Sequence, residues 1–498
     1  MTKKLRHHIL LFMLIVFPLL PVRAGEMPKY EVRAVWLTTL QGLDWPSAVV
    51  RSKSDIEKQK RQLTDILDKY HRANINTVFF QTRVRATTMF PSDASTGNEP
   101  WDTALTGRDN GNPDYDPLAF AVEECHRRGM ECHAWIVTIP VGKWNAQGCK
   151  ALRKRHSDIV MKIGDEGYMN PANTHTAQYL ARFCSGVTRR YDIDGIHLDY
   201  IRYPETMRCL PPPAEGRKNI TRIVQAIHDA VKKEKAWVKV SCSPIGKHDD
   251  TRRFSSKGWN ARTRVLQDAK AWLRQGLMDA EYPMMYFKGE HFYPFLVDWS
   301  ECRGVTPGLA AYLLHPRQKD WQLSDVTRQL WVSRSFGMGF CFFRSRFFTD
   351  NVKGLYDFVS NVFCPYPALV PAMRCSVADA ERPLQPQRLA LYSYGGKAYL
   401  AWCGVQDRSD GNYLLYNIYA SPYYPVDTTC GDNLLVARLR TTELELPQLP
   451  ENMYFAVTAT DRYGIESTPC QMSAENIPQD AMPGWYWVTH PLGKRQCR

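Results

Sequence analysis

The chain has 498 residues and a formal net charge of +13, with 44% hydrophobic and 23% charged residues. This length exceeds one ordinary domain, so we expect two domains. The basic balance suits an acidic polymer or surface as partner, although a merely solvated basic surface explains the charge equally well; the lysines and arginines are scattered, without the arm or stripe typical of nucleic-acid binding.

The N-terminal stretch predicts a secretory signal over residues 1–24. Basic residues precede an apolar run over 9–20, and Ala24 follows as a small residue at the expected cleavage point. The apolar run is short for a bilayer span, and no later stretch approaches the required length. We therefore expect an exported protein of the periplasm or cell envelope, without stable membrane insertion.

The cysteines number fourteen, which permits disulfides in an exported chain. Several of them fall inside apolar, strand-like runs, where cysteine usually acts as a small hydrophobic residue. These are Cys132, Cys242 and Cys341.

From residue 31 the pattern alternates between apolar strands and amphipathic helices. We expect eight strands, over 31–39, 76–84, 131–138, 193–199, 238–244, 280–286, 306–314 and 338–343. Helices are expected between them, over 53–72, 116–128, 173–190, 217–235, 259–275 and 324–336. This predicts an α/β fold, a closed parallel (β/α)8 TIM barrel over 28–363. No glycine-rich phosphate loop follows the first strand, and we expect no cofactor.

Prolines mark a linker over 364–385, after which the apolar runs become short and alternating. This predicts a small all-β sandwich over 386–470 and a tail over 471–498. The stretch 454–467 resembles the penultimate strand and turn of fibronectin type III domains, with Trp402 placed like their core tryptophan. Such a module is more often a spacer than a ligand binder.

The fourth expected strand ends in a carboxylate. His197 and Asp199 share one face of this strand, because side chains alternate along a strand. The carboxyl ends of barrel strands carry the chemistry of barrel enzymes, so Asp199 is our first candidate for a catalytic group. A buried aspartate that caps the next loop and a satisfied core histidine are the alternatives.

Several motifs resemble one family in order along the barrel. They are RAVW at 33–36, LDWP at 43–46, FQTR at 80–83, NEPW at 98–101, LTG at 105–107, HAW at 133–135, MNP at 169–171 and the run 194–204. Together they resemble the glycosyl-hydrolase-like family of bacterial envelope TIM-barrel proteins, which implies exported hydrolysis of peptidoglycan glycan strands stripped of stem peptides. The family often carries two successive aspartates after the strand, where this chain has Asp199 and then Tyr200.

Glycoside cleavage needs two carboxyl groups, one as proton donor and one as nucleophile or base. We assign Asp199 as nucleophile or base and Glu99 as proton donor, because Glu99 lies beside Trp101 in the loop after the second strand; Glu290 and Asp44 are the alternative donors. The candidates for substrate binding are His197, Gln81, Arg83, Trp36, Trp135, Arg202, Tyr286 and Glu290. For Gln81 and Arg83 the alternative is tethering the long loop, and for the aromatic residues it is a place in the core.

These observations favour a glycoside hydrolase that acts on a cell-wall or similar polysaccharide. The alternative is a noncatalytic glycan-binding protein on a barrel scaffold. A third hypothesis, metal-dependent hydrolysis through His197 and Asp199, needs further ligands, for which His133 and His315 are the evident strand histidines; we expect no metal. The sequence leaves the oligomeric state open.

Overall fold

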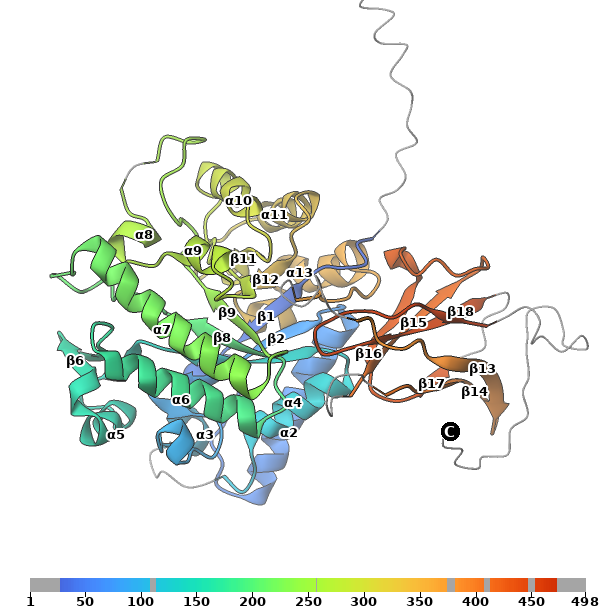
Figure 1. Cartoon of the computed structure of the whole chain (residues 1–498), viewed down its shortest axis with the longest axis horizontal. Helices are drawn as coiled ribbons and strands as arrows, with labels where there is room; N and C mark the ends of the chain where they lie inside the picture. Colours follow the sequence, from blue (N-terminus) through green and yellow to red (C-terminus); the bar gives the residue numbers. More distant parts are fainter. Residues whose placement is uncertain are drawn as a thin grey trace, which may run out of the picture.

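The computed structural model of the chain describes residues 27–107, 113–256, 258–373, 381–406, 413–446 and 453–472 (Figure 1). The expected secretory signal and most of the tail lie outside these residues. In the described part, no helix is both long and apolar enough to cross a membrane.

Eight parallel strands form the main sheet, in the order β10-β9-β8-β4-β2-β1-β12-β11. The two ends of this order meet through parallel bridges of Glu281 with Val305 and of Met284 with Gly308, which close the ring between β10 and β11. The expected α/β barrel is therefore confirmed. The strands are β1 (Arg33–Leu37), β2 (Thr77–Val84), β4 (Glu131–Val137), β8 (Gly195–Asp199), β9 (Lys239–Ser243), β10 (Ala280–Glu281), β11 (Gly308–Leu309) and β12 (Phe340–Phe342).

Amphipathic helices cover the outside of the barrel (Figure 1). In α2 (Lys53–Arg72), Ser52 caps the first turn and Ile56, Leu63, Leu67 and Tyr70 form the buried face, which fits the helical spacing of these residues. The other helices are α3 (Thr103–Thr106), α4 (Pro117–Arg127), α5 (Gln147–Arg155), α6 (Thr174–Arg190), α7 (Pro213–Glu234), α8 (Ala261–Arg264), α9 (Ala269–Arg274), α10 (Tyr293–Ser300), α11 (Leu323–Ser335), α12 (Ser345–Thr349) and α13 (Leu355–Phe358).

The expected helix over 259–275 is wrong in its middle, where the chain forms α8 and α9 with a break between them. Leu266 has a left-handed backbone there, with φ 54°. The Gln267 side chain crosses to other loops, because it donates to the Ile201 carbonyl and accepts from the Ile245 backbone N–H. Tertiary hydrogen bonds at the carboxyl end of the barrel thus override local helix propensity.

The expected strands over 280–286 and 306–314 were too long, and β10 covers only the first two residues of the former. The expected strand over 306–314 contains only β11, and a 3-10 turn (Ala311–Leu314) replaces its second half. The segment after β4 folds into a three-stranded antiparallel sheet of β5 (Pro140–Lys143), β7 (Glu166–Met169) and β6 (Val160–Ile163). A short strand, β3 (Thr87–Thr88), turns back on the end of β2.

Aromatic side chains fill the interior of the barrel. Trp36, Phe79 and Tyr282 are almost fully buried there and surround His197. The larger apolar layer lies between the strands and the helices and contains Cys132 and Cys242, which are free, buried thiols, as is Cys341 in the interior layer.

The C-terminal part forms two antiparallel sheets that share a core around Trp402, Ile418 and Val457. One sheet contains β13 (Gln387–Tyr394), β14 (Lys397–Cys403) and β17 (Glu443–Leu446). The other contains β16 (Leu434–Leu439), β15 (Leu415–Ser421), β18 (Tyr454–Thr460) and β19 (Cys470–Gln471). The expected all-β sandwich is confirmed, and its resemblance to fibronectin type III remains a prediction.

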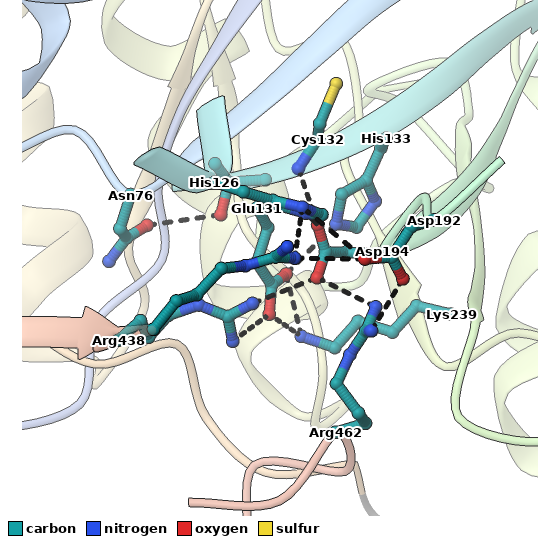
Figure 2. Close-up of polar contacts among 12 residues, drawn as sticks. Asn76, His126, Glu131, Cys132, His133, Asp192, Asp194, Lys239, Arg438 and Arg462 are labelled. Atoms are coloured by element: carbon teal, nitrogen blue, oxygen red, sulfur yellow. Dashed lines mark hydrogen bonds and ion pairs between the residues drawn. The ribbon is translucent and has the colours of Figure 1, made fainter. Parts of the chain in front are cut away.

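An ion network fastens these sheets beneath the amino-terminal ends of the barrel strands (Figure 2). Arg438 of β16 donates to Asp194 at 2.9 Å and to Glu131 at 3.2 Å, and Arg462 donates to Asp192 at 2.7 Å. Burial of Glu131 opposes its charge, but Lys239 and Arg438 lower its pKa to about 2. The C-terminal sheets are therefore anchored to the amino-terminal side of the barrel, away from the carboxyl ends of its strands.

Candidate functional site at the carboxyl end of the barrel

Asp199 ends β8 with a half-buried side chain whose carboxylate is held by three donors. The Trp135 indole N–H donates to Oδ2 at 3.1 Å, while the Ser243 hydroxyl and the Tyr200 backbone N–H donate to Oδ1 at 2.9 and 2.7 Å. Trp135 lies on β4 and Ser243 on β9, the two strands that flank β8. The carboxylate is thus fixed in orientation by its neighbours on both sides.

The loop after Asp199 contains a second carboxylate, Glu205, which binds two residues of the same loop. Tyr200 has a left-handed backbone with φ 55°, and its hydroxyl donates to Glu205. Arg202 donates to the other Glu205 oxygen through Nε at 3.1 Å and Nη2 at 2.8 Å, and its guanidinium centre lies 3.6 Å from the centroid of the Tyr200 ring. Burial opposes the charge of Glu205, but the Arg202 guanidinium holds the pKa of Glu205 below its ordinary value.

Glu99, the expected proton donor, is engaged in a buried ion pair with Arg83. Arg83 is fully buried, and its Nε and Nη2 atoms donate to the two Glu99 oxygens at 2.7–3.0 Å. Tyr179 also donates to Glu99, at 2.8 Å. Burial opposes the charge of Arg83, yet Glu99 raises the pKa of Arg83 above its ordinary value.

This geometry bears on the expected roles of Glu99 as proton donor and of Arg83 in substrate binding. Arg83 and Tyr179 donate to the Glu99 oxygens, and the Glu99 side chain is 1% exposed, so this carboxyl group is enclosed in the protein. The remaining Arg83 nitrogen, Nη1, donates to the carbonyls of Val137 and Thr138 at 2.5 and 3.1 Å, so Arg83 binds the protein and not a substrate.

Gln81 is a tether for the loop after β1. Its Oε1 atom accepts from the Thr38 hydroxyl at 2.7 Å and from the backbone N–H groups of Thr39 and Leu40 at 2.9 and 2.8 Å. Gln81 is 3% exposed. These contacts favour the alternative role for Gln81, that of tethering a loop, over sugar binding.

His197 and Trp36 are parts of the barrel interior and not of its surface. His197 is fully buried, accepts from the Trp36 indole at 3.0 Å and has its other ring nitrogen 3.0 Å from the Ser241 hydroxyl. Burial holds the pKa of His197 well below its ordinary value, so the ring is neutral. With both ring nitrogens engaged and no exposed surface, His197 does not reach a substrate, and Trp36 is 1% exposed. The expectation that they bind sugar is therefore wrong.

Trp135 also lies in the interior, being 3% exposed, so it positions Asp199 and is no stacking surface. Tyr286 is half-buried and stacks on Phe343 with ring centroids 5.5 Å apart, while Tyr312 meets both rings edge-on. Burial, with Cys341 and Asp199 as further causes, raises the pKa of Tyr286 well above its ordinary value. The Tyr286 phenol therefore stays protonated and remains a candidate for sugar binding.

The other expected carboxylates differ from each other. Glu290 lies exposed in a 3-10 turn, with His291 as its neighbour. Asp44 is buried, and burial raises its pKa, but it accepts from the Thr38 and Arg346 backbone N–H groups and is paired with Arg344. Asp44 thereby ties the β1 loop to the end of β12, and its side chain has no exposed surface.

Metal ligands do not converge at this site. In the described ranges, no group of three or more histidine, cysteine, aspartate or glutamate side chains is arranged to hold a metal ion. His133 lies near the amino-terminal end of the barrel, bound to Glu131, and His315 packs on Phe347.

Sequence reasoning missed Ser243 and Glu205. Ser243 had a detectable signal, because it is the last residue of a strand neighbouring β8 and shares the alternation of Asp199. Glu205 had only its spacing of three residues from Arg202, because the left-handed turn at Tyr200 that folds the loop back carries no glycine.

Comparison with known proteins finds similarity to glycosyl hydrolase-like proteins. Residues 31–209 match the model of the family "Glycosyl hydrolase-like 10". The chain is 26% identical over 392 residues to Glycosyl hydrolase YngK of Bacillus subtilis (strain 168), covering 71% of this chain and 76% of that one. It is 27% identical over 317 residues to Glycosyl hydrolase DigH of Escherichia coli (strain K12), covering 56% and 71%.

Among solved structures, alpha-L-fucosidase isoenzyme 2 from Paenibacillus thiaminolyticus has a TM-score of 0.44 at 14% identity, over 68% of this chain and 50% of that one. The Bacillus cereus spore cortex-lytic enzyme SleL has a TM-score of 0.39 at 9% identity, over 67% and 74%. The resemblance expected from the motifs is confirmed by the family model, which matches residues 31–209, and by the two curated glycosyl hydrolases.

Proposed function

We propose that this protein is an exported glycoside hydrolase that cleaves glycosidic bonds in a cell-wall polysaccharide, such as peptide-stripped peptidoglycan, with Asp199 as nucleophile or base. One observation carries the proposal. A carboxylate at the carboxyl end of a barrel strand is held by donors from both neighbouring strands and from the following residue. The glycosyl hydrolase-like relatives support a glycan-acting hydrolase as the class.

The contacts of Asp199 suit both a nucleophile and a general base. A nucleophile or base must hold one orientation toward the anomeric carbon or a water molecule, and fixed donors provide this without reorganisation during the reaction. The hydroxyl of Tyr286, whose high pKa keeps it protonated, supplies an O–H donor for a sugar oxygen.

The choice of polysaccharide rests on the sequence. The motifs shared with envelope proteins and the signal-like N-terminus support a substrate outside the cytoplasm. The basic charge supports an anionic glycan, because opposite charges raise the local concentration of a polymer at the surface.

A noncatalytic glycan-binding protein is the second candidate, favoured by the state of two carboxylates. Glu99 and Glu205 are both bound by arginine, so neither is an evident proton donor. A barrel that keeps Asp199 for binding sugar hydroxyls, without a proton donor, would bind glycan and leave it intact.

The test is product analysis by mass spectrometry with the wild-type protein and the Asp199→Asn variant. The substrates are intact peptidoglycan, peptide-stripped peptidoglycan and neutral polysaccharides. The proposal expects fragments from the stripped glycan with the wild type and none with the variant. Binding of glycan without any fragments from any substrate would favour the noncatalytic candidate.

A further inference from the structure

Two consecutive residues directly after β2 have a left-handed backbone although neither is glycine. Arg85 and Ala86 both have φ 55°. A left-handed backbone is unfavourable for residues other than glycine and persists only where the surrounding structure imposes it, which is most common at functional sites. The backbone of this turn is therefore held in place by its neighbours.

Two glycines from the segment after β4 provide the space for this turn. A Cβ atom at Gly148 would lie 2.2 Å from the Arg85 carbonyl oxygen, so only glycine allows this approach. A Cβ atom at Gly142 would lie 3.1–3.4 Å from the Arg85 side-chain carbons. The stem of Arg85 thus rests against the backbone at Gly142, and the turn is clamped between β5 and α5.

The positive charge of Arg85 is not neutralised by an ion pair with any residue in the described ranges. The side chain is exposed, and its guanidinium forms no hydrogen bond or ion pair with a residue in the described ranges. The positive charge of Arg85 acts electrostatically on the carboxyl group of Asp102. Asp102 is buried, however, and already accepts hydrogen bonds from the Thr87 hydroxyl and the Ala104 backbone N–H. Burial raises the pKa of Asp102, which weakens it as a counterion.

The register of the barrel places the end of β2 level with Asp199. Arg83 pairs with Ile136 on β4, and Val137 pairs with Asp199 on β8. Val84, the last residue of β2, therefore lies at the level of Asp199 and two strands away, a backbone separation of about 10 Å. Arg85 follows Val84 in the turn, so it stands at the same end of the barrel as Asp199.

We propose that Arg85 is a specificity-determining residue that binds a carboxylate on the glycan, one sugar unit or more away from the bond at Asp199. A guanidinium pairs with a carboxylate through two parallel hydrogen bonds, and a fixed stem lowers the entropy lost on binding. The carboxylate belongs to a uronic acid or to a carboxyalkyl ether such as the lactyl group of a peptide-stripped muramic acid. This inference rests on the proposed function for the position of the substrate.

The test measures binding and hydrolysis separately. Calorimetric titration uses oligosaccharides of peptide-stripped peptidoglycan and of a uronic-acid polymer, each with its carboxyl-reduced counterpart. The variant is Arg85→Asn, because asparagine tolerates the left-handed backbone and preserves the fold. Arg388→Asn is the matched control, because Arg388 is also exposed and has φ 54°, but lies on β13 in the C-terminal sheets.

We expect the wild type to bind one carboxylated oligosaccharide about tenfold or more tighter than its reduced form, and Arg85→Asn to remove this difference. The oligosaccharide that shows the difference identifies the source of the carboxylate. Arg388→Asn should behave as wild type. No binding, equal binding of charged and reduced forms, or a preference that persists in Arg85→Asn would each overturn the inference.

Failure of the proposed function is distinguishable from these outcomes. An Arg85-dependent preference in a protein that releases no fragments would support the carboxylate site and contradict hydrolysis. Hydrolysis of charged and reduced glycans at equal rates would support the proposed function and contradict the carboxylate site.

Discussion

Trp135 and Asp199 are joined by a hydrogen bond of 3.1 Å from the indole nitrogen to the carboxylate, across the neighbouring strands β4 and β8. Trp135 is 3% exposed, so this donor is shielded from water. The bond links the packed barrel interior to the one half-buried carboxylate at the end of β8, and the orientation of Asp199 therefore depends on the core.

Replacing Trp135 by phenylalanine removes this donor and keeps an aromatic ring. We expect kcat to fall by about tenfold or more, because a hydrogen bond to a charged group is worth about 1.5–3 kcal/mol. Trp36→Phe is the control, because Trp36 bonds to His197, and an equal fall of kcat in this variant would contradict a specific role for Trp135.

Glu99→Gln breaks the buried pair with Arg83. Removing one partner of a buried ion pair leaves the other charge uncompensated and costs about 3–5 kcal/mol, so we expect a large loss of stability in urea unfolding. The alkaline limb of activity, which reports the proton donor, should stay in place in any folded fraction, because the Glu99 carboxyl group is enclosed by Arg83 and Tyr179. Glu290→Gln, at an exposed position, should leave stability unchanged. A stable Glu99→Gln protein that lacks the alkaline limb would restore Glu99 as the acid.

Glu281 on β10 predicts a pH dependence of stability. It is fully buried, and burial raises its pKa from 4.5 to about 8, with the thiol of Cys242 beside it. Below pH 4.5 the group is protonated in the folded and the unfolded chain. Between about pH 4.5 and 8 only the unfolded chain releases the proton, so the free energy of unfolding falls as pH rises.

Thermal unfolding between pH 5 and 9 measures this effect. Glu281→Gln should make the profile flatter and raise the melting temperature most at high pH, because the buried amide carries no charge. Glu301→Gln, on the exposed surface, serves as the control. A wild-type profile whose steepness survives in Glu281→Gln would assign the pH dependence to other groups.

The network in Figure 2 predicts that the barrel and the C-terminal sheets unfold together. Arg438→Met keeps the apolar stem but leaves Glu131 and Asp194 with less compensation, and we expect a loss of about 3 kcal/mol or more. Arg388→Met is the control, because both arginines have a left-handed backbone and Arg388 is exposed. Two separate unfolding transitions in the wild type, or equal stability of the two variants, would contradict this role.

The barrel was predictable because its signals are local and repeated. Each strand is an apolar run of its own, and helices such as α2 carry their buried face at regular spacing. The break at Leu266 was not predictable, because the Gln267 side chain bonds to loops more than twenty residues away in sequence. Whether a short strand such as β11 forms, and how long it is, depends on pairing with its neighbours in the closed ring and not on its own residues.

The position of Asp199 could be predicted from the sequence, but the contacts of the residues around it could not. Asp199 stands at the end of a strand, a position that sequence alternation locates. The roles of Glu99 and Arg83 depended on which charged groups meet in space, and residues sixteen positions apart formed a closed pair. His197 lies on the same face of β8 as Asp199, as expected. It lies deeper in the barrel than Asp199, and for this reason it packs against Trp36 and Phe79.

The most direct test of Asp199 compares two substitutions in the same cluster, by the rate at which new reducing ends appear on the glycan that the wild type cleaves best. In Asp199→Asn either orientation of the amide sets its nitrogen against a donor, so we expect a modest loss of stability and a fall in rate of more than about 10³-fold. Ser243→Ala removes one donor and should reduce the rate by only about tenfold. An Asp199→Asn protein that is folded and stays within tenfold of the wild-type rate would contradict the catalytic role of Asp199.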